Sequence, residues 1–132
     1  MRAIGIDLGT TSICGVLMDT QTGKVLRSRT ENSNAFIDGA HFERKQSPEK
    51  IISLALEILE DLIDSETAAI GVTGQMHGIV YYDGEGKAVS PLYTWQDGRG
   101  DLPHPGGGTW ASWLSKRSGY ELATGYGLVT HA

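Results

Sequence analysis

Three short apolar segments follow one another at the N-terminus with only turns between them. Residues 2–8 and 12–18 are predicted strands on either side of Gly9-Thr10-Thr11, and a third strand over 25–30 follows the turn at Thr22-Gly23. Links this short cannot make the crossover that parallel neighbours require, so consecutive strands must run antiparallel. The sequence therefore predicts an antiparallel meander of three strands.

A helix follows the meander. Ser47-Pro48-Glu49 is typical of a helix start, with Ser as the N-cap and Pro at the first helical position. Apolar residues then recur at helical spacing from Ile51 to Ile63, which predicts one buried face. The remaining predicted elements are strands over 68–73 and 79–82, a turn over 83–86, an extended segment over 89–96, a loop over 101–108 and a helix over 109–117.

Strands on both sides of a helix predict an α/β protein with a mixed sheet. Residues 32–46 are polar and predicted to be irregular, and the tail over 122–132 has no clear pattern. A chain of 132 residues without a linker-like segment is expected to form part of one domain.

Charge and composition exclude several classes of partner. The net charge is −5 without any run of Lys or Arg, which argues against binding to a nucleic-acid backbone. No apolar stretch approaches the ~20 residues of a membrane-spanning helix. The acidic Asp7 lies where a signal peptide would need an uncharged apolar core. Cys14 is the only cysteine, so no internal disulfide can form. We therefore expect a cytoplasmic protein.

The turn between the first two predicted strands carries the first chemical motif. Asp7 ends a strand, and Gly9 lets backbone N–H groups approach a ligand closely. The hydroxyls of Thr10, Thr11 and Ser12 add donors that suit phosphate oxygens, and the carboxylate of Asp7 suits Mg²⁺. The alternative is an ordinary hairpin turn with no ligand.

A second motif, Gly71-Val-Thr-Gly-Gln-Met-His-Gly78, ends the predicted strand after the helix. His77 can donate and accept hydrogen bonds to the hydroxyls of a ligand, and Met76 can pack against an apolar ligand surface. A lone His or Met would more often fill a core position. The whole block of eight residues favours a binding site.

The third motif contains Trp95, Asp97 and Arg99. Residues two apart on extended backbone point to the same side, so the acid and the guanidinium can present an acceptor and a fork of donors to a polar ligand. They can equally pair with each other as a structural ion pair under Trp95. Both interpretations stay open for Arg99, and ligand contact is modestly favoured for Asp97.

These motifs resemble those of the FGGY family of carbohydrate kinases. Asp-Leu-Gly-Thr-Thr-Ser resembles the first phosphate motif of the actin-like ATPase superfold, and Gln-Met-His-Gly resembles the sugar-side segment of xylulokinase-type members. The second and third motifs together with Ala123-Thr124-Gly125-Tyr126-Gly127 are most similar to the sedoheptulokinase type, although Tyr126 by itself is better explained as a packed ring in a turn.

The resemblance implies a ribonuclease-H-like N-terminal domain that is truncated in this chain, with the second, nucleotide-binding domain absent. It implies ATP and Mg²⁺ as cofactors, with Asp7 at the metal and Gly9, Thr10, Thr11 and Ser12 at the phosphates. It also implies sugar contacts for Gln75, Met76, His77, Trp95, Asp97 and Arg99. The family's catalytic Asp base has no counterpart among these residues, so the chain alone is expected to be inactive.

The reaction implied for the full-length protein is phosphorylation of a terminal hydroxyl of a ketose, with sedoheptulose ranked before xylulose. A homodimer of the full-length protein is compatible with the resemblance. Two rival functions stay open: a non-catalytic sugar-binding or regulatory module, and a chaperone-type ATPase of the same superfold. A non-catalytic module would have no use for the Asp7 motif, whose presence argues against it.

Overall fold

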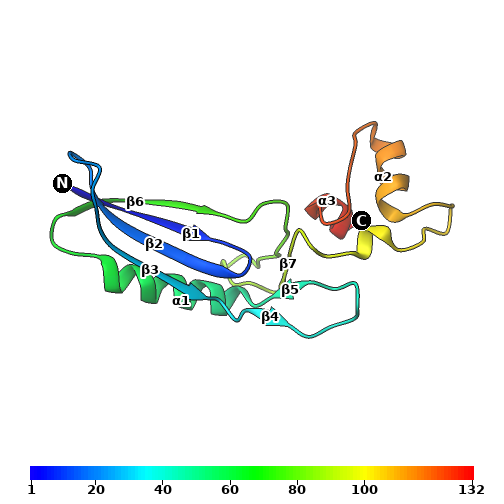
Figure 1. The fold of residues 1–132 in the computed structure, drawn as a ribbon. Coiled ribbons are helices and arrows are strands. Elements are labelled where there is room, and N and C mark those ends of the chain that lie inside the picture. Colours follow the sequence, from blue (N-terminus) through cyan, green and yellow to red (C-terminus); the bar gives the residue numbers. More distant parts are fainter. The chain divides into compact units, whose positions relative to one another are not determined.

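The computed structural model describes all residues from 1 to 132, and they form two compact units (Figure 1). Unit 1 contains Met1–Ala35 and Glu49–Gln75, and unit 2 contains Phe36–Pro48 and Met76–Ala132. Each unit is built from two separate stretches of chain. For this reason no single linker between them is visible in the sequence, and the assignment of the whole chain to one domain stays a prediction.

A four-stranded mixed sheet forms the frame of unit 1. Its order is β3-β2-β1-β6, from β1 (Arg2–Leu8), β2 (Ser12–Asp19), β3 (Val25–Asn32) and β6 (Thr67–Gly74). The pairs β1–β2 and β2–β3 are antiparallel, which confirms the predicted meander. The β1–β6 pair is parallel, so the sheet is mixed as expected.

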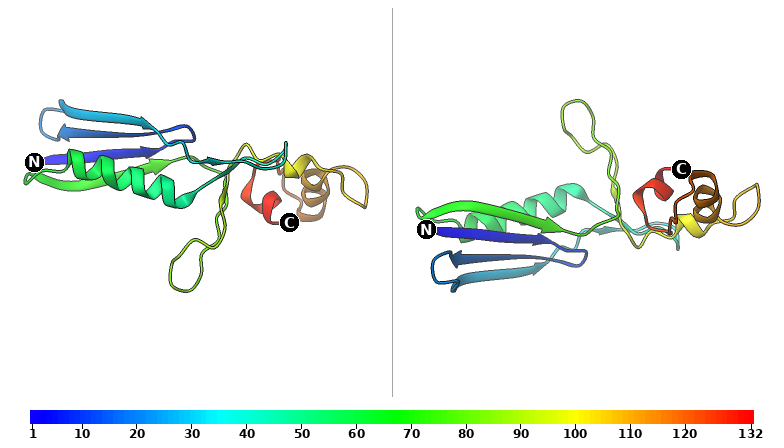
Figure 2. Two further views of the ribbon diagram at one scale, coloured as in Figure 1. Left: turned by 90° about the horizontal axis from the view of Figure 1, so that it is seen from below. Right: turned by 90° about the horizontal axis from the view of Figure 1, so that it is seen from above.

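Helix α1 (Pro48–Leu62) packs against one face of this sheet (Figure 2). Gly15 in β2 makes the packing close, because a Cβ there would lie 2.6 Å from both Ile58 and Leu62. Full burial of a large aliphatic side chain contributes about 1.5–3 kcal/mol, so this layer is the main apolar source of stability in unit 1. Its buried members are Ile4, Ile6, Ile13, Leu17, Ile51, Ala55, Ile58 and Leu62.

Unit 2 has little regular structure. A small antiparallel sheet of order β4-β5-β7 joins the two-residue strands β4 (Phe36–Ile37), β5 (Lys45–Gln46) and β7 (Leu92–Tyr93). A short 3-10 helix, η1 (Arg99–Asp101), and the α-helices α2 (Trp110–Ser118) and α3 (Gly127–His131) follow.

The predicted second helix is confirmed as α2, and its ends have clear local causes. The Thr109 hydroxyl accepts from the backbone N–H of Ser112, and the Ser112 hydroxyl accepts from the backbone N–H of Thr109, which completes a capping box. At the other end Gly119 has φ +78°, a left-handed conformation that glycine adopts without steric cost.

Three sequence expectations for unit 2 need correction. The strand predicted over 79–82 is wrong: only single bridges form, Ile79 with Tyr93 and Tyr82 with Ala88. The N–H of Tyr81 donates to the hydroxyl of Ser90 instead of to a backbone carbonyl, which interrupts the ladder. Of the extended segment over 89–96 only β7 is a strand, and the irregular segment over 32–46 contains both β4 and β5.

Candidate active site

The phosphate turn and Gln75 lie side by side in unit 1 because β1 and β6 run parallel. The carboxyl ends of parallel neighbours share one edge of the sheet, and here Leu8 pairs with Gly74. Beyond that pair, the N–H of Gln75 donates to the Leu8 carbonyl at 3.0 Å. The hydroxyl of Thr10 then donates to Oε1 of Gln75 at 3.3 Å. The structure therefore joins the first motif to the start of the second.

Asp7 lies on the face of the sheet that α1 leaves open. Its neighbour in β1, Ile6, is buried on the α1 side, and successive strand residues point to opposite faces. The carboxylate is exposed and makes no hydrogen bond or ion pair within the chain. It borders a cavity of about 420 Å³ whose lining also includes Cys14 and Thr73, the residues that pair with Asp7 on either side.

These residues fit a magnesium ion held together with phosphate. Mg²⁺ keeps several waters and takes one or two carboxylates plus substrate phosphates, so one free carboxylate suffices from the protein. No group of three or more acidic, His or Cys side chains gathers anywhere in the chain to hold a metal alone.

The turn beside Asp7 is tight enough to require glycine. A Cβ on Gly9 would lie 2.8 Å from the Ser12 carbonyl oxygen and 3.7 Å from Oδ2 of Asp7. The Thr11 carbonyl accepts from both the N–H and the hydroxyl of Ser33, at 2.9 and 3.1 Å, and this fixes the turn. The Thr11 side chain stays exposed and Ser12 is half-buried.

Three segments of unit 2 come together through glycine contacts: 76–78, 93–97 and 124–127. A Cβ on Gly78 would lie 2.8 Å from the Tyr93 carbonyl oxygen, and one on Gly127 would lie 3.1 Å from the Gly78 carbonyl oxygen. At Gly125 an added Cβ would overlap the carbonyl of Trp95, and φ there is +82°. Met76 and His77 of the second motif therefore lie in one unit with the third motif, whereas Gln75 belongs to unit 1.

His77 is held in an unusual conformation. Its φ is +66°, which is uncommon for any residue other than glycine and is a form of backbone strain often found at functional sites. Its ring stacks on Tyr126 with centroids 4.5 Å apart and planes 8° from parallel. The neighbouring Met76 is 71% exposed. The packed ring expected for Tyr126 is observed, and its partner is a predicted sugar-side residue.

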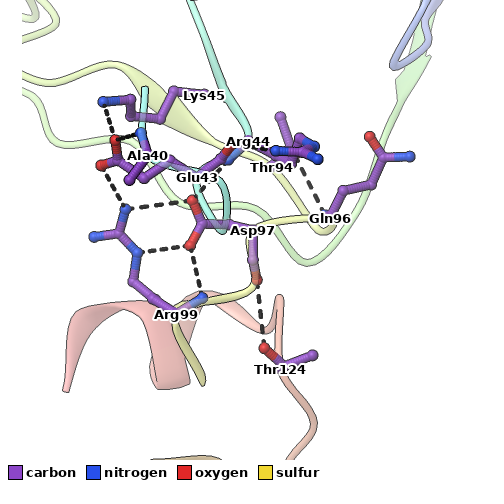
Figure 3. A network of polar contacts seen from close by, with 9 residues as sticks. All are labelled: Ala40, Glu43, Arg44, Lys45, Thr94, Gln96, Asp97, Arg99 and Thr124. Atoms are coloured by element: carbon purple, nitrogen blue, oxygen red, sulfur yellow. Dashed lines mark hydrogen bonds and ion pairs between the residues drawn. The ribbon is translucent and has the colours of Figure 1, made fainter. Parts of the chain in front are cut away.

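Asp97 and Arg99 form a tight ion pair (Figure 3). Nε of Arg99 donates to Oδ1 of Asp97 at 2.6 Å, and Nη2 donates to Oδ2 at 3.3 Å. The guanidinium also lies over the Tyr93 ring, 4.4 Å from its centroid. Asp97 is fully buried, whereas the Arg99 side chain is 25% exposed.

The electrostatics of this pair have a clear balance. Burial alone would raise the pKa of the Asp97 carboxyl, but hydrogen bonds from Arg99 and from the backbone N–H of Arg44 outweigh it, so the pKa lies below its ordinary value. The bond to Asp97 in turn raises the pKa of Arg99. The pairing alternative is thus observed; sugar contact by Asp97, Arg99 and the exposed Trp95 stays a prediction.

The sequence matches the FGGY family of carbohydrate kinases, N-terminal domain, over residues 2–102. The chain belongs to this family. It is 32% identical to the sedoheptulokinase of Mus musculus, over 98% of this chain and 33% of that protein. It is also 32% identical to the xylulose kinase of Escherichia coli strain K12, over 73% of this chain and 20% of that protein.

Solved structures of FGGY kinases share the fold. A xyloylose kinase from Brucella ovis aligns with a TM-score of 0.84 at 21% identity, over 98% of this chain and 28% of that chain. A gluconate kinase from Lactobacillus acidophilus aligns with a TM-score of 0.70 at 27% identity, over 90% of this chain and 23% of that chain. The expected mixed-sheet fold of the actin-like ATPase type is confirmed.

The FGGY chain described here spans about a third of the length of its sedoheptulokinase relatives. Among its helices, none combines the length and the apolar character needed to cross a membrane. Sequence reasoning missed two residues that support the motifs. Tyr126 was recognised only as a packed ring, and Glu43 lies in the segment predicted to be irregular, where no pattern marked it.

Proposed function

We propose that this chain is the N-terminal part of an ATP-dependent kinase that phosphorylates a terminal hydroxyl of a ketose in the cytoplasm. The observation that carries the proposal is the contact between Thr10 of the phosphate turn and Gln75 of the sugar-side motif. A kinase must bring phosphate and sugar to one place, since phosphoryl transfer depends on positioning and charge neutralisation.

The sugar is ranked by how far the relatives match. The sedoheptulokinases of mouse and human align over 98% and 96% of this chain, whereas the xylulose kinase of Escherichia coli aligns over 73%. This supports sedoheptulose as the first candidate and xylulose as the second.

Each motif has a proposed role. Asp7 would hold Mg²⁺, and the turn from Gly9 to Ser12 would bind phosphate oxygens through backbone N–H groups and hydroxyls. Mg²⁺, when bound with ATP, would neutralise charge on the transferred phosphoryl group. Gln75, Met76, His77 and Trp95 would contact the sugar, with Asp97 and Arg99 beside them. The base that takes the hydroxyl proton would come from a later segment of the protein.

The test is ADP release by the whole protein with MgATP and a panel of ketoses. We expect turnover with a seven- or five-carbon ketose, and a loss of roughly 10²–10³-fold in kcat for Asp7→Ala, as when a key charge-stabilising group is removed. Asp38→Ala is the matched control, because Asp38 is also an exposed acid but lies outside every motif. Sugar binding without turnover would instead favour a regulatory module.

The chain of 132 residues assayed alone should release no ADP, because it lacks the base and the adenosine pocket expected from the rest of the protein. Activity in the isolated chain that disappears with Asp7→Ala would contradict this part of the proposal.

A further inference from the structure

Residues 40–45 hold the loop that carries the third motif along its whole length. The N–H of Thr94 donates to the Arg44 carbonyl at 2.9 Å, and the N–H of Gly98 donates to the Phe42 carbonyl at 2.7 Å. Between them, the N–H of Arg44 donates to Oδ2 of Asp97 at 3.1 Å. Because all three bonds use backbone groups of 42–44, the placement of the loop depends on the shape of this supporting segment.

Glu43 sets that shape through its own turn. Its N–H donates to the Ala40 carbonyl at 2.9 Å, and the N–H of Ala40 donates back to Oε2 of Glu43 at 2.9 Å. A Cβ on Gly39 would collide with the same Oε2, so glycine is needed for the carboxylate to fold back. Nζ of Lys45 also donates to Oε2, at 2.9 Å.

The second oxygen of the same carboxylate reaches the ion pair. Oε1 of Glu43 lies 3.5 Å from Nη2 of Arg99, which also binds Asp97 (Figure 3). Two acids and two bases thus form one balanced cluster, with Lys45 as the fourth member. The hydrogen bond from Lys45, followed by the one from the Ala40 N–H, lowers the pKa of Glu43, so its carboxylate is charged at neutral pH.

The loop held in this way ends at the exposed part of the third motif. The N–H of Asp97 donates to the Thr94 carbonyl at 3.0 Å, which closes the turn that carries Trp95. Trp95 is 48% exposed, and its carbonyl packs against Gly125, next to the ring stack of Tyr126 on His77. A shift of the supporting segment would therefore move residues of both sugar-side motifs.

We propose that Glu43 is a positioning residue for the ketose site: its two oxygens fix the 40–43 turn and Arg99 together, and so set where Trp95 stands. This inference rests on the proposed ketose kinase function. Glu43 does not itself contact the sugar in this scheme.

The first experiment measures steady-state kinetics of the whole protein with Glu43→Gln and with Lys45→Met as the matched control. The amide has one acceptor oxygen and cannot accept at both ends, whereas Lys45→Met leaves both contacts of Glu43 to Ala40 and Arg99. For Glu43→Gln we expect the ketose KM to rise roughly tenfold, the equivalent of about 1.4 kcal/mol, with kcat and the KM for ATP unchanged. Lys45→Met should leave all three constants unchanged.

A purely structural role would give a different result. Loss of folded protein would lower kcat and leave the ketose KM unchanged, and that outcome would overturn the proposal. An equal rise in the ketose KM for Lys45→Met would overturn it as well, because the effect would then follow the charge of the cluster and not the two contacts of Glu43.

The second experiment separates this inference from the proposed reaction. Hydrogen exchange is measured for two backbone amides. The amide of Arg44 donates to Asp97 in the loop, and the amide of Gly98 donates from the loop to the Phe42 carbonyl. We expect faster exchange at both in Glu43→Gln and no change in Lys45→Met. If the wild-type protein phosphorylates no ketose, the proposed reaction fails. The exchange experiment still tests whether Glu43 positions the loop, and unchanged exchange in Glu43→Gln would overturn that role.

Discussion

The fully buried large side chains of unit 1 are all aliphatic, whereas those of unit 2 are Gln46, Thr94 and Asp97. Unit 1 gains stability from buried apolar area, and this contribution is not directional. In unit 2, buried polar groups must each keep a partner, and glycines allow backbones to touch. The comparison teaches that the frame of the proposed phosphate side is stabilised by apolar burial, while the proposed sugar side depends on paired polar groups.

The aromatic residues provide a way to follow the two units separately. All three Trp and all five Tyr lie in unit 2, so intrinsic fluorescence reports that unit alone. Helix α1, the longest helix, spans 15 residues that belong almost wholly to unit 1. Hydrogen exchange along α1 therefore reports unit 1.

The largest effect is expected from Gly125→Ala. The new Cβ would overlap the Trp95 carbonyl, and φ of +82° is unfavourable for alanine. The free energy of unfolding of unit 2 should therefore fall by more than about 4 kcal/mol. Tryptophan emission should shift to that of solvent-exposed indole, while exchange along α1 stays protected. The matched control is Gly84→Ala, because Gly84 has open space around it. Normal emission from Gly125→Ala would show that unit 2 tolerates backbone shifts.

Next in size is Ile58→Ala in unit 1. Ile58 is fully buried against the sheet, and truncation should cost about 2–5 kcal/mol through lost burial and a cavity. Exchange along α1 should accelerate with little change in tryptophan emission. Leu56→Ala, at a site 54% exposed, should have a much smaller effect on α1. If Ile58→Ala changed tryptophan emission as much as exchange along α1, the two units would unfold together.

For Asp97→Asn we expect the free energy of unfolding to fall by about 2 kcal/mol. The amide nitrogen of Asn would face the N–H donors of Arg99, which would then be poorly paired. The folded-state pKa of Asp97 is lowered, so its contribution is present above the unfolded-state value of about 3.9 and is lost as pH falls through the folded-state pKa. In urea unfolding followed by fluorescence, the difference between wild type and variant should therefore begin to shrink as the pH falls below about 4. A constant difference at all pH values would exclude the ion pair as its source.

The smallest effect is expected for Arg29→Gln on the outer strand of unit 1. Arg29 pairs with Glu31 and Glu57, whose side chains are 46% and 61% exposed. Solvent screens such pairs, so the thermal midpoint should not change beyond experimental error. A clear drop in the midpoint would show that charge contributes to unit 1 as well, and would weaken the contrast between the units.

The sequence predicted unit 1 far better than unit 2. Strand alternation and helical spacing are local patterns, and they correctly placed β1, β2, β3 and α1. The parallel pairing of β1 with β6 was not foreseen, because it joins residues about 65 positions apart, as the contact of Thr10 with Gln75 does.

Unit 2 was predicted poorly because its contacts join residues far apart in the sequence and follow no repeating pattern. The predicted pairing of Asp97 with Arg99 is observed, but the extended backbone expected there is wrong, because Gly98 has φ −90° and ψ 5° and a 3-10 helix begins at Arg99. Nothing local could reveal that Glu43, 56 residues from Arg99, completes their network, or that Tyr126 lies on His77. Likewise, the strand predicted over 79–82 fails because one hydroxyl replaces a backbone acceptor.

The interleaving of the two units has a consequence for synthesis of the chain. The polypeptide passes from one unit to the other after residues 35, 48 and 75, so neither unit is complete when its first stretch leaves the ribosome. The outer edge of β1 must wait for β6, and pairings over long sequence distances form slowly. During that interval the meander exposes an unpaired strand edge, which can pair with another chain.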